Sequence, residues 1–152
     1  MTTLAWIGWT LGLLATVEYL AHRYLMHRPT LSLFRSTLYR HATQHHRDNN
    51  STNIDMPAWW GLLLMLPVLV LLWVAGAHDG VCVLAVLTAV YCWLWTGLHR
   101  AFHGVGGGWT RRLPGYRSLY QHHTRHHECP TRNFGAVFGP VFDVVNGTRW
   151  EP

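Results

Sequence analysis

Histidine is concentrated in this chain at a density that few kinds of chemistry require. Of 152 residues 12 are histidine, and the stretch "YQHHTRHHE" (120–128) holds four of them. The other groups are "HRYLMH" (22–27), "HATQHH" (41–46) and "HRAFH" (99–103), while His78 stands alone. Protonating all these rings together would cause strong repulsion, and neutral rings near a bilayer need partners for their nitrogens. Metal ligation meets both demands, so the pattern predicts a metal site.

The spacing within each group predicts which rings point the same way. At about 100° per residue on an α-helix, His99 and His103 diverge by about 40°, as do His123 and His127, so each pair can hold one ion. Pairs spaced by five diverge by about 140°, too far for one ion on a straight helix, and we expect them to flank a larger centre or reach two ions. These pairs are His22 with His27 and His41 with His46.

The four groups divide into two similar halves, each a histidine pair followed by an HxxHH or HxxxHH group. This arrangement suits two metal ions a few ångströms apart, held by the ends of a helical bundle. All-imidazole sites suit Zn, Fe, Cu or Ni, whereas Mg and Ca prefer oxygen ligands. A zinc site uses three or four protein ligands, so about ten indicate two ions. An electron-poor pair of irons fits the oxidation of an unactivated C–H bond with O2.

Three apolar segments must position these groups. The chain is 49% hydrophobic, has nine Trp and is only 12% charged. Residues 4–20, 58–75 and 81–98 approach the roughly 20 apolar residues that cross a bilayer. A domain this small could not cover the last two all round as core helices, and the first lacks the basic start of a cleaved signal peptide. We therefore expect one all-α integral membrane domain, residues 1–152.

The distribution of arginine predicts the topology. All twelve basic residues are arginine, within 23–47 or 100–149, and "GAHDG" at 76–80 predicts a tight antiparallel hairpin. The positive-inside rule places residues 22–56 and the chain from 99 onward in the cytoplasm, with the amino terminus outside. The sequence thus predicts about three transmembrane helices with a cytoplasmic histidine-rich helical cap. The membrane would be the cell membrane of a bacterium or the endoplasmic reticulum of a eukaryote.

The remaining features point away from other classes. Cys82, Cys92 and Cys129 make no disulfide framework and are expected to be packing residues. The sequence pI of 9.6 is assigned to topology and anionic headgroups, because the arginines are dispersed and no nucleic-acid-binding module surrounds them. Gly and Pro in 103–116 predict a flexible loop.

The histidine groups, followed by "NFG" (133–135) and "FDVVNGT" (142–148), resemble the fatty acid hydroxylase superfamily of integral membrane di-iron oxygenases. Its members include fatty acid 2-hydroxylases, sterol desaturases, sterol methyl oxidases and carotenoid hydroxylases. The resemblance covers residues from about 18 to 150. It implies a monooxygenase with two iron ions and O2 as co-substrate, which hydroxylates a fatty acyl chain, sterol or carotenoid taken from the bilayer.

The resemblance also implies the residues of the site. The ligands would be His22, His27, His41, His45, His46, His99, His103, His123, His126 and His127. In the fourth group the HxxHH spacing selects His123, whereas an HxxxHH spacing selects His122, and both remain open. Glu18, Asn133 and Asp143 are expected to orient ligands, the alternatives being a helix-end carboxylate or a turn-forming Asn.

Two departures from the family bear on substrate and partner. Many relatives carry four membrane helices, whereas three short spans are expected here, which puts the shape of the substrate tunnel in doubt. No haem motif of a fused cytochrome-b5-like domain is present. We therefore expect a separate electron donor of ferredoxin, rubredoxin or cytochrome type, docked on the arginine-rich face.

Other functions remain as alternatives. A lipid desaturase would use the same centre, and the sequence does not separate it from a hydroxylase. A membrane metal-binding or transport protein would need ligands along a crossing path, but Leu62–Leu72 and Val81–Val90 contain none. A zinc hydrolase would need fewer ligands and an HExxH motif, which is absent, although zinc is the alternative metal in the purified protein.

Overall fold

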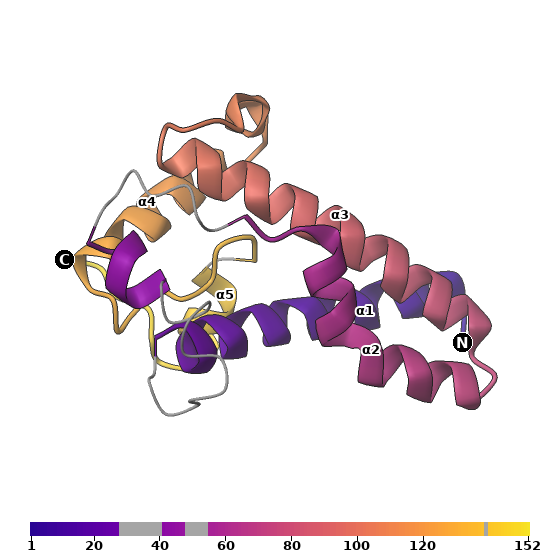
Figure 1. The fold of residues 1–152 in the computed structure, drawn as a ribbon. Coiled ribbons are helices and arrows are strands. Elements are labelled where there is room, and N and C mark those ends of the chain that lie inside the picture. The colour runs from indigo at the N-terminus through magenta and orange to yellow at the C-terminus, as the bar shows by residue number, and fades with distance from the viewer. Residues whose placement is uncertain (28–40, 48–54, 139) are drawn as a thin grey trace.

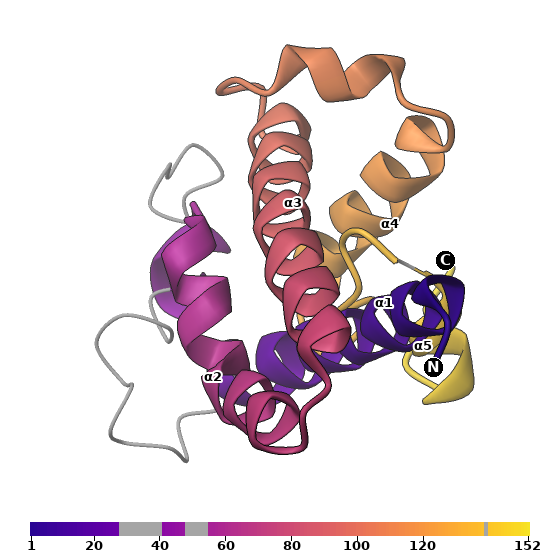
Figure 2. The ribbon, with the colours of Figure 1, turned by 90° about the vertical axis from the view of Figure 1, so that its right-hand side faces the viewer.

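The fold is entirely helical within residues 1–27, 41–47, 55–138 and 140–152, which the computed structural model describes (Figure 1). This confirms the prediction of an all-α fold. The long helices are α1 (Thr3–Leu20), α2 (Ala58–Val74) and α3 (His78–Phe102). Shorter elements follow α3: η4 (Gly108–Arg112), α4 (Tyr116–Glu128) and α5 (Pro140–Val145). Helix α3 is central, because it contacts α1, α2, η4 and α4 (Figure 2).

Helix α1 is an apolar helix with a polar amino-terminal cap. The Thr2 hydroxyl accepts a hydrogen bond from the Ala5 amide at 3.3 Å, which satisfies one of the unpaired amides at the helix start. At its other end α1 passes directly into the π-helix η1 (Ala21–Met26). A second π-helix, η3, covers His41–His45. Both π-helices carry histidines of the predicted ligand set.

Helices α2 and α3 form the predicted hairpin with a shorter connection. Only Ala75–Ala77 separates them, and Gly76 has a φ of +73°, which glycine adopts without strain. Helix α3 starts at His78, and Asp79 in its first turn interacts favourably with the positive end of the helix dipole. It continues past the predicted end at 98 to Phe102, and this extension carries His99.

Two helical stretches, Thr3–Met26 and His78–Phe102, are long and apolar enough to cross a membrane. Helix α2 is apolar but has only 17 residues, with Pro67 inside, so a third crossing stays a prediction. Large apolar side chains face outward, with Leu71 68% and Val86 61% exposed. Such an apolar surface marks a face that contacts lipid or protein.

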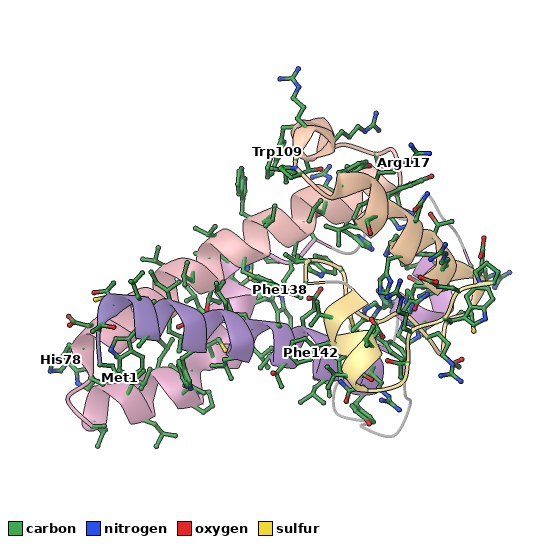
Figure 3. All side chains as sticks on the ribbon, turned by 180° about the vertical axis from the view of Figure 1, so that it is seen from behind. Met1, His78, Trp109, Arg117, Phe138 and Phe142 are labelled. Carbon is green, nitrogen blue, oxygen red and sulfur yellow. The ribbon has the colours of Figure 1, made fainter. Side chains whose placement is uncertain are left out.

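The molecule has an apolar end and a histidine-rich end. Met1 and His78 lie together at one end, and side-chain nitrogens gather at the other, near α4 (Figure 3). Between them, the core cluster draws Leu14 from α1, Met65 from α2 and Trp95 from α3. Ala136 joins the same cluster, so the segment after α4 folds back between the long helices.

The predicted flexible loop at 103–116 instead contains a packed 3₁₀ helix, η4. The Thr110 hydroxyl is fully buried and lies 3.4 Å from the Gly97 carbonyl oxygen of α3. The rings of Trp109 and Trp93 stack at 4.1 Å. A Cβ atom on Gly107 would lie 1.9 Å from the Gly97 carbonyl oxygen, so only glycine permits this approach. The glycines that suggested flexibility here allow close backbone packing.

We expect Gly107→Ala to destabilise the protein by at least about 2 kcal/mol, because it combines a strained positive φ with a backbone clash. Gly104→Ala is the matched control, since Gly104 has a φ of +70° but nothing within 4 Å of an added Cβ. Thermal unfolding in detergent measures both variants. Equal melting temperatures for the two would contradict the packing of η4 on α3.

Candidate metal centre

The histidine pairs spaced by five lie on π-helical turns. In such a turn the amide of residue i+5 bonds to the carbonyl of residue i, which stacks i and i+5 on one face. The His46 amide accordingly donates to the His41 carbonyl at 3.2 Å. Ring centroids lie 5.0 Å apart for His22 and His27, and 5.0 Å apart for His41 and His46. The expectation that these pairs diverge too far to share an ion is wrong, because it assumed α-helical winding.

Ring nitrogens from three separate segments converge in a first group, all within 4.8 Å of one another. The closest pairs are His22 Nε2 with His41 Nε2 at 2.8 Å, and His126 Nε2 with His27 Nε2 at 3.1 Å. The members are His22, His27, His41, His46 and His126. This set has enough nitrogen donors for one metal ion.

A second group, with the same spread of ring nitrogens, adjoins the first. Its members are His45, His103, His123 and His127. His103 Nε2 lies 2.8 Å from His123 Nε2, and the His127 ring stacks on that of His46 in the first group at 4.3 Å. Two metal ions in these groups would therefore be neighbours.

Each half of the sequence contributes one histidine to the group that consists mainly of residues from the other half. Consecutive residues His45 and His46 go to different groups, as do His126 and His127. The first group combines the pair His22 and His27 with histidines from 41–46 and 120–128, whereas the second combines His103 alone with histidines from the same two stretches. Neither half of the chain completes a group alone.

His99 lies beside the second group rather than in it. Its ring is 4.9 Å from that of His103 and 4.9 Å from that of His123, and it stacks on Trp95 at 4.7 Å. The His99 Nε2 atom is buried and has no hydrogen-bond partner among the described residues. The structure therefore places nine of the ten histidines of the predicted ligand set in the two groups and His99 at their edge.

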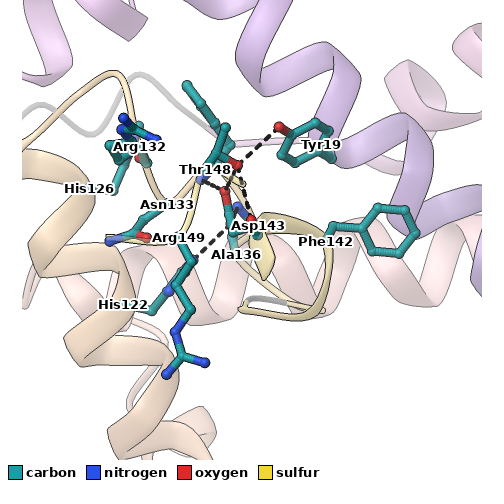
Figure 4. A network of polar contacts seen from close by, with 12 residues as sticks. Tyr19, His122, His126, Arg132, Asn133, Ala136, Phe142, Asp143, Thr148 and Arg149 are labelled. Carbon is teal, nitrogen blue, oxygen red and sulfur yellow. Dashed lines mark hydrogen bonds and ion pairs between the residues drawn. The ribbon is translucent and has the colours of Figure 1, made fainter. Parts of the chain in front are cut away.

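His122 and His123 have separate roles in the structure. His123 belongs to the second group, whereas His122 Nε2 lies 3.0 Å from Oδ2 of Asp143 (Figure 4). Since carboxylate oxygens only accept, His122 donates this hydrogen bond. Asp143 is thus tied to α4 but touches no histidine of either group directly.

Asp143 is the centre of a buried polar network (Figure 4). It accepts hydrogen bonds from the amides of Phe134 and Gly135, each at 2.9 Å, and from the Thr148 hydroxyl at 2.7 Å. The Tyr19 hydroxyl of α1 lies 3.0 Å from that of Thr148. Burial alone would raise the pKa of Asp143, but hydrogen bonds from His122, Thr148 and the two amides outweigh it and lower the pKa. The network joins α1, α4, α5 and the 133–136 segment around an ionised carboxylate.

Glu18 and Asn133 also hold backbone segments. Glu18 Oε1 accepts from the amides of Ala136 at 2.8 Å and Val137 at 3.1 Å. Asn133 has a φ of +55° and exchanges two hydrogen bonds with the backbone of Trp150, at 2.8 and 3.0 Å. These contacts fix the segment after α4 against α1 and the carboxyl-terminal residues.

Two backbone carbonyls near the first group set the tautomers of its histidines. The Phe134 carbonyl accepts a hydrogen bond from His22 Nδ1, and the Arg132 carbonyl accepts one from His126 Nδ1 at 2.6 Å. A carbonyl oxygen only accepts, so each neutral ring carries its proton on Nδ1 and presents the Nε2 lone pair to the group. A backbone carbonyl has no side-chain signature, so the sequence did not predict these acceptors.

Burial keeps the rings of both groups neutral. It lowers the pKa of His27 and of His127 to about 2, and that of His46 to about 4, because a charged ring is poorly solvated there and neighbouring imidazoles add repulsion. The same two causes bring the pKa well below its ordinary value at His41, His123 and His126. Neutral imidazole is the form that binds metal.

The family model for fatty acid hydroxylases matches residues 7–148. The chain belongs to the fatty acid hydroxylase family. Comparisons with curated proteins and with solved structures give no match. Membership implies an oxidoreductase of the lipid hydroxylase or desaturase type, in a family that is typically iron-dependent. With two apolar helices of crossing length, it also indicates association with a membrane.

The donor set of this family member fits a transition metal. Both ring nitrogens of His46 and of His127, and Nδ1 of His41, are buried without a hydrogen bond to any described residue. Leaving so many polar atoms unpaired is costly, and metal coordination pairs one lone pair on each ring. Imidazole suits Fe, Zn, Cu or Ni and not Mg or Ca. The residues therefore fit the iron that is typical of the family.

We expect the metal-free hydroxylase-family protein to lose stability as the pH falls from about 6.5 towards 4. The unfolded chain takes up protons in this range, whereas the folded rings with a lowered pKa do not, so stability decreases by up to about 1.4 kcal/mol per pH unit for each ring. Thermal unfolding across this range measures the effect, with His78→Ala as a control at the far end of the molecule. A melting temperature independent of pH would contradict burial of the neutral rings.

We expect Asp143→Asn to weaken iron binding by about tenfold, because an amide cannot accept all the hydrogen bonds that hold α4 and the 134–135 backbone. Iron titration followed by optical absorption measures the affinity. Glu128→Gln, which changes an exposed carboxylate at the end of α4, is the matched control and should bind iron as the wild type does. Equal iron affinities for the wild type and both variants would show that the Asp143 network does not support iron binding.

Proposed function

We propose that this protein is an O2-dependent membrane oxygenase that hydroxylates a C–H bond of a lipid, with two iron ions held by the two histidine groups. The observation that carries the proposal is the convergence of five and four imidazoles in adjoining buried groups. A single zinc site would leave about half of these donors unused. Family membership supports iron as the metal and lipid oxidation as the reaction class.

One ion would bind to each group, with His99 beside the second ion. With iron bound there, O2 would supply the oxidising power: one oxygen atom would enter the C–H bond as a hydroxyl group, and the other would leave as water with two electrons and two protons. Imidazole ligands are neutral and leave the ion pair electron-poor, which suits attack on an unactivated bond.

The chain contributes preorganisation and exclusion of water. The carbonyls of Phe134 and Arg132 hold the Nδ1 protons of His22 and His126, so these rings need no rearrangement when metal binds. The Phe134 ring lies 5.7 Å from that of His22 and 5.6 Å from that of His126, and covers the first group on one side. A dry, fixed ligand set limits the loss of oxidising equivalents to solvent.

We further propose three membrane crossings by α1 with η1, α2 and α3. The amino terminus and the α2–α3 turn would lie outside, and the histidine groups and carboxyl terminus in the cytoplasm. The positive-inside rule supports this orientation, since the basic residues flank the histidine-rich end. The membrane is the cell membrane in a bacterium or the endoplasmic reticulum in a eukaryote.

Electrons would come from a separate acidic protein of ferredoxin, rubredoxin or cytochrome type. Arg111 and Arg112 are exposed on η4, and Arg117 is exposed on α4, the helix of the fourth histidine stretch (Figure 3). Opposite charges speed the encounter of such partners and orient them. Docking there would bring the donor close to α4, which carries ligands of both groups.

Metal analysis with Mössbauer spectroscopy, on protein purified anaerobically in detergent, tests the proposal. About two irons per chain, exchange-coupled when oxidised, are expected. One tightly held zinc and no iron would contradict it. Lipid profiling of cells with and without the gene then separates hydroxylation, which adds oxygen to the product, from desaturation by the same centre, which removes two hydrogens.

We expect His126→Ala to abolish turnover and to lower the iron content by at least half, while membrane insertion stays intact. His126 belongs to the first group, and its ring is fixed by the Arg132 carbonyl, so no neighbouring side chain replaces it. Iron per chain and membrane fractionation are the measurements. His78→Ala removes a histidine at the opposite end and should retain iron and activity. Normal turnover in His126→Ala would show that His126 is not part of the site.

A further inference from the structure

Helix α3 stacks a readily oxidised ring on the histidines at its end. The Trp95 indole lies almost parallel to the His99 imidazole, with ring centroids 4.7 Å apart and an interplanar angle of 12°. His99 in turn contacts three rings of the second group, at centroid distances of 4.7, 4.9 and 4.9 Å. These rings are those of His45, His103 and His123. Trp95 is therefore separated from the second group by a single imidazole.

The other non-histidine rings at this site resist oxidation. Among the described residues they are Phe102, which stacks on His123 at 5.0 Å, and Phe134, which lies 5.6 Å from the rings of His27 and His126. Phenylalanine gives up an electron far less readily than tryptophan or tyrosine, because its ring carries no electron-donating nitrogen or hydroxyl group. Of the described rings that contact the two groups or His99, only the indole of Trp95 is readily oxidised.

A tyrosine lies one turn farther from the histidines on the same helix. Tyr91, Trp95 and His99 recur every four residues, so they lie along one side of α3. Tyr91 is 7% and Trp95 2% exposed, and both belong to the apolar core cluster. The Phe138 ring stacks on Tyr91 at 5.7 Å. A buried row of oxidisable rings thus leads from the middle of the bundle to His99.

The Tyr91 hydroxyl has a carboxylate beside it. A cavity between α1, α2 and α3 reaches the first histidine group, and Glu18, His22 and Tyr91 form part of its wall. The Glu18 carboxylate interacts with the buried Tyr91 hydroxyl. Glu18 Oε1 accepts the amides of Ala136 and Val137, so Oε2 is the oxygen that can take up a proton. Oxidised tyrosine releases its hydroxyl proton, because the oxidised phenol is a strong acid, and Glu18 is placed to accept it.

We propose that Trp95 and Tyr91 are a redox-active pair that gives electrons through His99 to the oxidised metal centre when no lipid is present to react. The inference rests on the proposed function, in which iron and O2 supply the oxidant. Trp95 loses one electron to the centre and regains one from Tyr91, whose proton passes to Glu18, which leaves a neutral tyrosyl radical. One electron from the ferredoxin-, rubredoxin- or cytochrome-type donor, with the proton from Glu18, restores the phenol. Each cycle removes one oxidising equivalent and spares the histidine ligands from oxidation.

Rapid freeze-quench electron paramagnetic resonance tests the pair. Iron-loaded, chemically reduced protein in detergent is mixed with O2 without added lipid. We expect a tyrosyl radical whose signal narrows when the tyrosine rings are deuterated. Tyr91→Phe should abolish this signal and leave a tryptophan radical, whereas Trp95→Phe should abolish both. A wild type without a tyrosyl radical, or a tyrosyl signal undiminished in either variant, would overturn the proposal.

Trp93→Phe is the matched control for Trp95→Phe. Trp93 lies two residues away on α3 but is 61% exposed and stacks on Trp109 instead of on a histidine. This variant should give the wild-type radical signal. Equal loss of the signal in Trp93→Phe and Trp95→Phe would mean that the effect does not depend on the contact with His99.

Oxidative damage distinguishes protection from a purely structural role of Trp95. Trp95→Phe keeps an aromatic ring in the core, and we expect wild-type iron content but a severalfold rise in histidine oxidation under O2, measured by mass spectrometry. Trp95→Tyr restores an oxidisable ring and should return the damage towards the wild-type level. If Trp95→Phe loads less iron, Tyr91→Phe decides the question, since the Tyr91 ring contacts no described histidine of the site. Histidine oxidation equal to wild type in Tyr91→Phe would overturn the protective role.

Iron content and lipid products separate this inference from the proposed function. Protein that holds two irons and hydroxylates lipid, but forms no radical at Tyr91, keeps the oxygenase function and overturns the redox pair. Protein that holds one zinc and no iron overturns the oxygenase function, and the redox pair with it, because no oxidant forms. The two failures therefore give different results.

Discussion

The structure depends on the confinement of many neutral imidazoles in one buried volume. Burial and mutual repulsion prevent protonation of rings such as His27 and His127, and few hydrogen-bond partners are available to their nitrogens. Without a further partner, these buried unpaired polar atoms would lower the stability of the folded protein. Metal coordination would give these nitrogens the partners that they lack.

Local winding and long-range convergence build the two groups together. The π-turns place His22 with His27, and His41 with His46, on common faces. Helix α4 then supplies His126 to one group and, one residue later, His127 to the other. Because each group draws on both halves of the chain, loss of either half would dismantle both groups. Binding of metal by these groups would therefore be coupled to packing of the helices at this end.

The segment after α4 connects the two histidine groups with the apolar core of the bundle. Its carbonyls orient His22 and His126, its amides bind Asp143 and Glu18, and Ala136 enters the apolar core. Glu18 also borders the cavity that reaches His22. One stretch of backbone thus fixes the orientation of the ligands, the position of the helices and the wall of the cavity. A lipid-oxidising site requires this, because small displacements of the reacting carbon lower the reaction rate.

The sequence alone determined the all-helical class, the apolar segments, the family and the set of histidines, because these follow from composition, hydropathy and residue spacing that need no coordinates. It did not determine how the histidines sort into groups: α-helical geometry predicted divergence for the five-spaced pairs, and the choice between His122 and His123 stayed open. Only the tertiary structure separated these neighbours, since Asp143, 21 residues beyond His122, engages one and leaves the other facing His103. The carbonyls of Phe134 and Arg132 were equally hidden, because a backbone acceptor acquires its role only from the position that the fold gives it.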